Sequence, residues 1–139
     1  MPFEVNIFDS GAGVQYVSAG LITGKDFIET KVNLLTSKDR LKNIRYLIYD
    51  LTHMDSLDFP FDDFKKLEDA DRLVAEINPS LIIALIVKND LALTLAKMWV
   101  TRTHEILWDK HIVSVKAEAY SWVRDKVRER FGEEITGYC

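Results

Sequence analysis

Residues 81–87, which read LIIALIV, are the stretch of this sequence that decides its fold. Seven consecutive apolar residues are too few to cross a bilayer, which needs about 20. Turn-forming residues bound the run, with Pro79 two positions before it and Asn89 two positions after it. Because no polar residue alternates within it, the run predicts an inner strand of a sheet that helices cover on both faces.

A second apolar run and a helix precede this strand. Residues 44–51 are apolar except for Arg45 and Asp50, so they predict another inner strand. Between the two runs, apolar residues recur at helical spacing over residues 64–77. Pro60 suits the first turn of that helix and Pro79 ends it, which makes the segment a strand–helix–strand unit.

The N-terminal residues predict two antiparallel strands and a helix. Residues 3–8 alternate apolar and polar side chains, residues 9–13 have the composition of a turn, and residues 14–22 resume as a strand. Thr23 as N-cap and Asp26 three residues later then predict the start of a helix. A polar connection at residues 38–40 follows that helix.

The C-terminal residues predict a helix, a strand and a last helix. The helix that follows the strand at residues 81–87 begins with Asn89 or Asp90 as its N-cap. Residues 111–115 form the short strand, and residues 116–131 form the last helix, which Gly132 ends.

The alternation of strands and helices predicts an α/β fold with right-handed crossovers. We expect a five-stranded, mostly parallel sheet with an N-terminal antiparallel strand and four helices. A chain of 139 residues predicts a single domain, which we place at residues 1–132, with residues 133–139 as a flexible C-terminal tail.

Composition limits the partners of this chain. With 18 Lys and Arg against 22 Asp and Glu, the net charge is −4, which argues against nucleic-acid binding. No apolar segment is long enough for an integral membrane span. The N-terminus has no basic region followed by an apolar stretch, so we expect a cytoplasmic protein. Cys139 is the one cysteine, which excludes an internal disulfide.

Short motifs in this sequence resemble known domains. Residues 47–52, LIYDLT, followed by an acidic loop, resemble a strand end of the STAS fold. Residues 84–91, ALIVKNDL, then residues 96–99, AKMW, and Ala119 followed by Trp122-Val123 are similar to the SpoIIAA-like family. The resemblance covers most of residues 3–125. It implies a STAS/SpoIIAA-like domain, with a shape similar to that of lipid-binding CRAL-TRIO domains.

One departure from the STAS pattern bears on regulation. STAS domains of the anti-sigma-factor-antagonist group carry a phosphorylatable serine directly after an aspartate, eight or nine residues beyond the strand-end aspartate. Counting from Asp50 leads to Asp58 followed by Phe59, so phenylalanine replaces the serine, and Ser56 lies three residues earlier. The resemblance therefore implies the SpoIIAA-like branch, whose members commonly lack this serine and have no general assigned activity.

The acidic loop 52–63 is a candidate partner surface. Four carboxylates within nine residues also suggest a Ca²⁺ or Mg²⁺ site, but the pattern of a calcium loop is absent. Stabilisation of the N-terminus of the next helix is the more ordinary interpretation of these charges. The candidate surface comprises Asp55, Ser56, Asp58, Asp62 and Asp63.

A crevice at the carboxyl ends of the parallel strands is the candidate ligand site. A helix N-terminus near Asp90 suits an anionic head group. Asp50 and Asp90 oppose an anion, so we expect a neutral or zwitterionic head. The expected lining is Thr23, Gly24, Asp50, Thr52, His53, Lys88, Asn89 and Asp90, with an apolar tail that reaches Met98 and Trp99. At helical spacing, such aromatic residues are more often core residues than ligand contacts.

No catalytic motif is present. The sequence has neither a Gly-x-Ser-x-Gly nucleophile motif nor a phosphate loop, and His53, His104 and His111 lack metal-ligand spacing. We therefore assign no catalytic, cofactor-binding or metal-ligating residue and expect no cofactor. The sequence predicts a non-catalytic domain, a regulatory module for an unknown protein partner. The alternative is a carrier or sensor of a small, apolar, lipid-like ligand, and a homodimer is left open.

Overall fold

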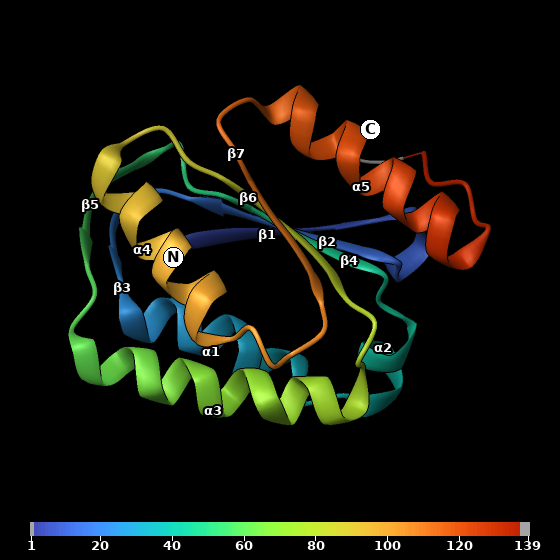
Figure 1. Ribbon diagram of the computed structural model, residues 1–139, viewed down its shortest axis with the longest axis horizontal. Helices are drawn as coiled ribbons and strands as arrows, with labels where there is room; N and C mark the ends of the chain where they lie inside the picture. Colours follow the sequence, from blue (N-terminus) through green and yellow to red (C-terminus); the bar gives the residue numbers. More distant parts are fainter. Residues whose placement is uncertain (1, 137–139) are drawn as a thin grey trace.

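The computed structural model describes residues 2–136. A five-stranded sheet runs through its centre, with β1 antiparallel to β2 and every other neighbouring pair parallel (Figure 1). In order across the sheet, the strands are β1 (Phe3–Phe8), β2 (Gly13–Ser18), β4 (Tyr46–Asp50), β6 (Ile82–Ile86) and β7 (Asp109–Val113). The predicted α/β class, mostly parallel sheet and antiparallel N-terminal strand are confirmed.

Helices cover both faces of this sheet (Figure 1). One face packs against α1 (Gly24–Leu34), α2 (Lys38–Asn43), α3 (Phe61–Ile77) and α4 (Asp90–Arg102), and the other face packs against α5 (Lys116–Phe131). Each face therefore has its own hydrophobic core.

Strand β6 belongs to both cores. Residues 81–87 are all buried, and β6 lies between β4 and β7. Ile83 and Leu85 point into the core under α1, α3 and α4, whereas Ile82 and Ala84 point into the core under α5. Both faces of the strand are covered, which explains why its sequence has no polar alternation and confirms the predicted inner strand.

The structure differs from the sequence prediction at two strands. Residues 14–22 do not form one strand: β2 ends at Ser18, and Gly20, with a φ of 67°, begins β3 (Gly20–Thr23). Strand β3 leaves the main sheet and pairs in parallel with β5 (Met54–Asp58), in the segment expected to be an acidic loop. The side chains of β5 are mostly exposed, so this strand lacks the apolar pattern that would have predicted it.

A further difference is α2, which lies where the sequence predicts a polar connection at residues 38–40. The described residues therefore contain five α-helices, whereas the sequence predicts four. Ser37 caps this short helix, and Leu41 is its buried residue. One apolar residue among five polar ones left no helical stripe in the sequence.

The predicted helix ends agree with the structure. Thr23 and Asp26 form a reciprocal capping box at the start of α1, with the Asp26 N–H donating to Thr23 Oγ1 over 3.3 Å. Asn89 Oδ1 accepts from the Ala92 N–H at the start of α4, over 2.7 Å. Gly132 ends α5 with a φ of 64°, a conformation that glycine adopts without strain.

The first residues of the expected C-terminal tail lie against the body of the protein. Two ion pairs join them to it, Arg45 with Glu133 and Arg128 with Glu134. Residues 137–139, including Cys139, lie outside the described residues.

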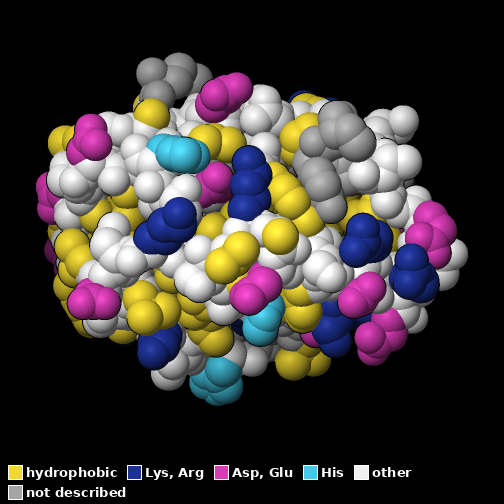
Figure 2. Space-filling model, turned by 90° about the horizontal axis from the view of Figure 1, so that it is seen from above, with side chains coloured by type: hydrophobic (Ala, Val, Ile, Leu, Met, Phe, Trp, Pro, Cys, Tyr) yellow, Lys and Arg dark blue, Asp and Glu magenta, His cyan; other side chains and the backbone are white. Residues whose placement is uncertain are grey.

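The surface carries charges of both signs. On the face shown in Figure 2, basic and acidic side chains are interspersed among hydrophobic and neutral ones. Over residues 2–136, no helix has the length and apolarity that a membrane span requires.

Candidate functional site

A small apolar cavity lies between the sheet and helices α1, α3 and α4. Its volume is about 50 Å³. Among its described lining residues, Lys31 alone is charged, so we name it the Lys31 cavity. The lining consists of Phe27, Lys31, Tyr49, Leu51, Leu57, Phe59, Phe64, Leu67, Leu85, Ala92, Leu95, Ala96 and Trp99.

A buried ion pair borders this cavity. Lys31 Nζ, on α1, donates to Asp71 Oδ1, on α3, over 2.5 Å, and the two side chains are 4% and 0% exposed. The indole N–H of Trp99, on α4, donates to the other carboxylate oxygen over 2.8 Å. Asp71 therefore joins the three helices that enclose the cavity. Since burying charged groups is costly, this pair sets the cavity apart from an ordinary apolar core.

Aromatic rings surround the Lys31 ammonium. Its Nζ lies 5.1 Å from the ring centroid of Trp99 and 5.6 Å from those of Tyr49 and Trp108. Such cation–π contacts offset part of the loss of hydration. Within residues 2–136, Asp71 is the one hydrogen-bond acceptor that this ammonium reaches, although an ammonium has three donors.

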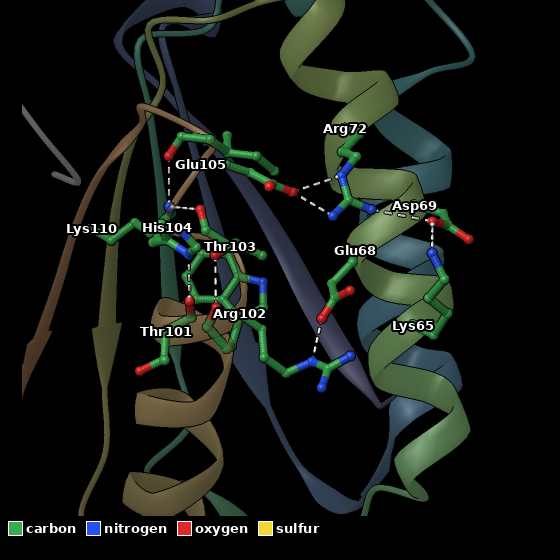
Figure 3. A network of polar contacts seen from close by, with 12 residues as sticks. Lys65, Glu68, Asp69, Arg72, Thr101, Arg102, Thr103, His104, Glu105 and Lys110 are labelled. Carbon is green, nitrogen blue, oxygen red and sulfur yellow. Dashed lines mark hydrogen bonds and ion pairs between the residues drawn. The ribbon is translucent and has the colours of Figure 1, made fainter.

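A second ammonium lies nearby, on β7. Lys110 Nζ is 5.8 Å from the Trp99 ring centroid and donates to the carbonyl oxygens of Thr103 and Ile106, just beyond α4 (Figure 3). Burial lowers the pKa of Lys110, an effect that Asp71 opposes and Lys31 reinforces. Lys31, Lys110 and Asp71 thus form a cluster of two ammonium groups and one carboxylate.

Ion pairs join α3 to α4 and to the residues that follow it (Figure 3). Arg102 pairs with Glu68, whose side chain is buried, and Arg72 pairs with Glu105. The Arg102 guanidinium also lies 5.1 Å from the ring centroid of Phe61. These contacts join two of the helices that line the cavity.

Part of the lining reaches the surface of the protein. Phe27 of α1, Leu57 of β5, Phe59 and Leu95 of α4 line the cavity and are also partly exposed. Phe59, which replaces the expected serine, stacks on Phe64 with ring centroids 4.3 Å apart. A molecule that enters the cavity would have to pass these side chains.

Two buried tyrosines lead us to predict that the protein loses stability at alkaline pH. Tyr49 lines the cavity, and the Tyr16 ring stacks on it with ring centroids 4.6 Å apart. Burial raises the pKa of both phenols above the ordinary value of 10.0, so the fold favours their neutral forms. Their contribution to stability is complete below pH 10 and declines as the pH rises from there towards the raised pKa values. Each tyrosine should remove about 1.4 kcal/mol of unfolding free energy per pH unit in that range.

Urea melts between about pH 9 and 11.5 measure this slope. Tyr16→Phe should remove the share of the slope that belongs to Tyr16. An equal slope in wild type and Tyr16→Phe would mean that this phenol ionises in the folded protein.

The residues of the expected crevice do not line one pocket. Asp50 is buried at the end of β4, where Thr52 donates to it from its N–H over 3.0 Å and its hydroxyl over 2.6 Å. His53 Nε2 lies 3.8 Å from the same carboxylate. Lys88, Asn89 and Asp90 instead line a separate groove at the ends of β6 and β7.

The other expected crevice residues are also dispersed. Trp99 lines the Lys31 cavity, whereas Met98 lies in a groove on the outside of α4. Thr23 and Gly24 lie at the start of α1, where a Cβ on Gly24 would be 2.6 Å from Asp63 Cβ.

On the candidate partner surface, Asp55, Ser56, Asp58 and Asp62 are exposed, as that hypothesis requires. Asp63 differs, because the close approach of α1 and α3 buries it. In the described part of the chain, no three His, Cys, Asp or Glu side chains are grouped to hold a metal ion.

Sequence reasoning missed Lys31 and Asp71. A signal was present, because each stands in an apolar helical stripe: Lys31 lies four residues after Phe27, and Asp71 four after Leu67. Because the apolar stripe of a helix faces the core, a charged residue within that stripe is buried with it. Their pairing depends on how α1 packs on α3.

Comparison with solved structures gives a match over most of the chain. An uncharacterized protein of the DUF3478 family from Shewanella loihica, whose crystal structure has a SpoIIAA-like fold, superposes with a TM-score of 0.51. The match covers 87% of this chain and 93% of that chain, at 16% sequence identity. The fold is SpoIIAA-like. No family model and no curated protein matches the sequence.

Proposed function

We propose that this SpoIIAA-like domain is a non-catalytic sensor or carrier that binds a small apolar ligand in the Lys31 cavity. The observation that carries the proposal is the cavity itself, an apolar space between the sheet and three helices that borders the buried Lys31–Asp71 pair. Small-molecule sites are lined predominantly by hydrophobic and aromatic side chains, as this cavity is. Stability alone does not favour such a pair, since hydrophobic replacements of buried ion pairs are often neutral or stabilising.

The size of the cavity bears on how a ligand would enter. Its volume of about 50 Å³ is a fraction of the roughly 150 Å³ cavity that binds benzene. A ligand would therefore displace lining side chains that reach the surface, such as Leu57, Phe59 or Leu95. Because these residues adjoin the exposed surface of β5 and α4, occupancy would change what a partner meets there, as a sensor requires.

The chemistry of the lining supports binding without catalysis. The described lining contains no Ser, Cys, His or carboxylate side chain, and its two titratable residues, Lys31 and Tyr49, are engaged with Asp71 and Thr30. Acid–base and nucleophilic catalysis need such groups next to one another and to the substrate.

Native mass spectrometry of the freshly purified protein tests the proposal. We expect one small molecule bound to each chain. Leu95→Trp, which puts a larger side chain into the lining, should remove it, whereas Leu91→Trp, one turn earlier on the same helix and outside the lining, should retain it. A bare chain, or an adduct that persists in Leu95→Trp, would contradict the proposal.

A regulatory protein-interaction module is the second candidate. It is favoured by β5, which pairs with β3 in a two-stranded sheet and exposes Asp55, Ser56 and Asp58. An exposed strand edge can accept a strand from a partner, and the carboxylates would favour a basic one. The same mass spectra distinguish the two candidates. The interaction module should appear bound to a second polypeptide, which could be another copy of this chain, and not to a small molecule.

A further inference from the structure

We infer that two copies of this chain associate through β1, the edge strand of the main sheet, and join their sheets into one continuous sheet. The inference assigns an interaction surface that involves neither the Lys31 cavity nor β5. It is therefore independent of the proposed ligand.

The other strand edges of this fold are protected against pairing with a further chain. An open edge exposes backbone donors and acceptors, and natural proteins blunt it with charged side chains, short strands or irregular register. At the opposite edge of the main sheet, β7 carries Asp109, Lys110 and His111. In the small sheet, β5 carries Asp55 and Asp58, and β3 is four residues long with a shift in register.

Strand β1 lacks these protections. It is six residues long, pairs with β2 in regular register along its whole length, and has Glu4 as its one charged residue. Val5 and Ile7 are each 50% exposed, although both are large apolar residues. Since an uncharged, regular and apolar edge readily accepts another strand, β1 is the edge most suited to be covered.

The backbone groups of β1 that face outward determine how a second strand can pair with it. The Ala19 N–H donates to the Pro2 carbonyl oxygen over 2.9 Å, so the backbone of residue 2 faces β2. In an antiparallel pair, residues face the neighbouring strand alternately, so the even-numbered residues of β1 face β2. The N–H and C=O groups of Phe3, Val5 and Ile7 therefore point to the open edge.

One antiparallel register between two copies of β1 uses all of these outward groups. With Val5 opposite Val5 of the second copy, Phe3 lies opposite Ile7 on both sides of a two-fold axis. Each of these pairs then exchanges both of its main-chain hydrogen bonds, and a shift by two residues loses pairs at the end of β1. The same register places apolar side chains opposite one another on the face that α1 covers, where Phe3 contacts Phe27.

The other face of the joined sheet is complementary as well. There the register places the exposed Glu4 of one copy opposite Asn6 of the other. Asn6 Nδ2 donates one hydrogen to Gln15 Oε1 over 3.2 Å, and an amide nitrogen has two. The Glu4 carboxylate can accept the second hydrogen, and no like charges lie opposite each other. Because β1 is complementary to itself on both faces, its partner is a second copy of this chain.

Sedimentation velocity tests this association. Wild type should be a dimer at concentrations up to about 0.1 mM. Val5→Lys, which places two ammonium groups opposite each other at the two-fold axis, should weaken the dimer at least about tenfold. Val115→Lys is the matched control, since Val115 is 48% exposed and follows β7 at the far edge of the sheet. It should leave the dimer unchanged, and circular dichroism checks that both variants are folded.

Cross-linking tests the register. In a Cys139→Ser background, two copies of Val5→Cys should form a disulfide in oxidising buffer. The Cα atoms of a hydrogen-bonded antiparallel pair are about 5.5 Å apart, within the range that a disulfide spans. Two copies of Ile7→Cys should not link, because four residues of strand, about 14 Å, separate them.

Three results would overturn the inference: a monomeric wild type, a dimer that survives Val5→Lys, and a disulfide through Ile7→Cys but not through Val5→Cys. A dimer that survives Val5→Lys would point to another surface, such as β5. All three results would leave the ligand proposal standing, because neither Val5 nor Ile7 lines the Lys31 cavity.

Discussion

Asp71→Ala should lower the free energy of unfolding by about 3–5 kcal/mol, the cost of removing one partner from a buried ion pair. The Asp71 side chain is 0% exposed and accepts from both Lys31 and Trp99. Its removal leaves an ammonium in apolar surroundings and an indole N–H without its acceptor. Urea melts measure the loss.

Two comparisons isolate the cause of this loss. Lys31→Met/Asp71→Leu removes both charges and should cost far less than Asp71→Ala, since a buried pair can be replaced by apolar residues at little cost. Asp69→Ala, two residues away on the exposed side of α3, should change stability by less than about 0.5 kcal/mol. A loss below about 1 kcal/mol in Asp71→Ala would show that water reaches the Lys31 ammonium.

Ile83→Ala should cost about 2–5 kcal/mol through lost burial and the space left behind. Ile83 is 0% exposed and lies in the middle of β6, paired with Leu47 of β4 and Lys110 of β7. Neighbouring strands on both sides limit how far the site can collapse, which favours the upper part of the range.

Leu107→Ala is the control for Ile83→Ala, because the same kind of apolar residue is 82% exposed there. Its free energy of unfolding, measured by urea melts, should differ from that of the wild type by no more than about 0.5 kcal/mol. If Ile83→Ala also lowered the free energy of unfolding by no more than about 0.5 kcal/mol, β6 would lie at the periphery of the sheet, which would contradict the strand order.

The sheet and most helices could be predicted because burial leaves a pattern in the sequence. Residues 81–87 and 44–51 are apolar on both faces since helices cover both, and local caps such as Thr23 and Asn89 act within a few residues. Strand β5 left no such pattern, because its pairing with β3 keeps most of its side chains in water.

The cavity could not be predicted in the same way. Lys31 and Asp71 are 40 residues apart, and their contact is set by the packing of α1 on α3. The rule that ligands bind at the carboxyl ends of strands selected Asp50 and Asn89, which do lie at such ends. In the fold, however, Thr52 donates to Asp50, and Asn89 caps α4. Both therefore have local structural roles that sequence spacing alone cannot separate from ligand binding.

The ¹H–¹⁵N NMR signals of the three tryptophan indole groups, followed during a titration with the small apolar probe 1-hexanol, test the central claim most directly. The Trp99 indole N–H donates to Asp71 next to Lys31, so its signal should shift and saturate as the cavity fills. Trp122, stacked on His111 and packed in the core under α5, should keep its position. A Trp99 signal that stays fixed while 1-hexanol binds, or while the Trp122 signal moves, would show that the ligand site is not the Lys31 cavity.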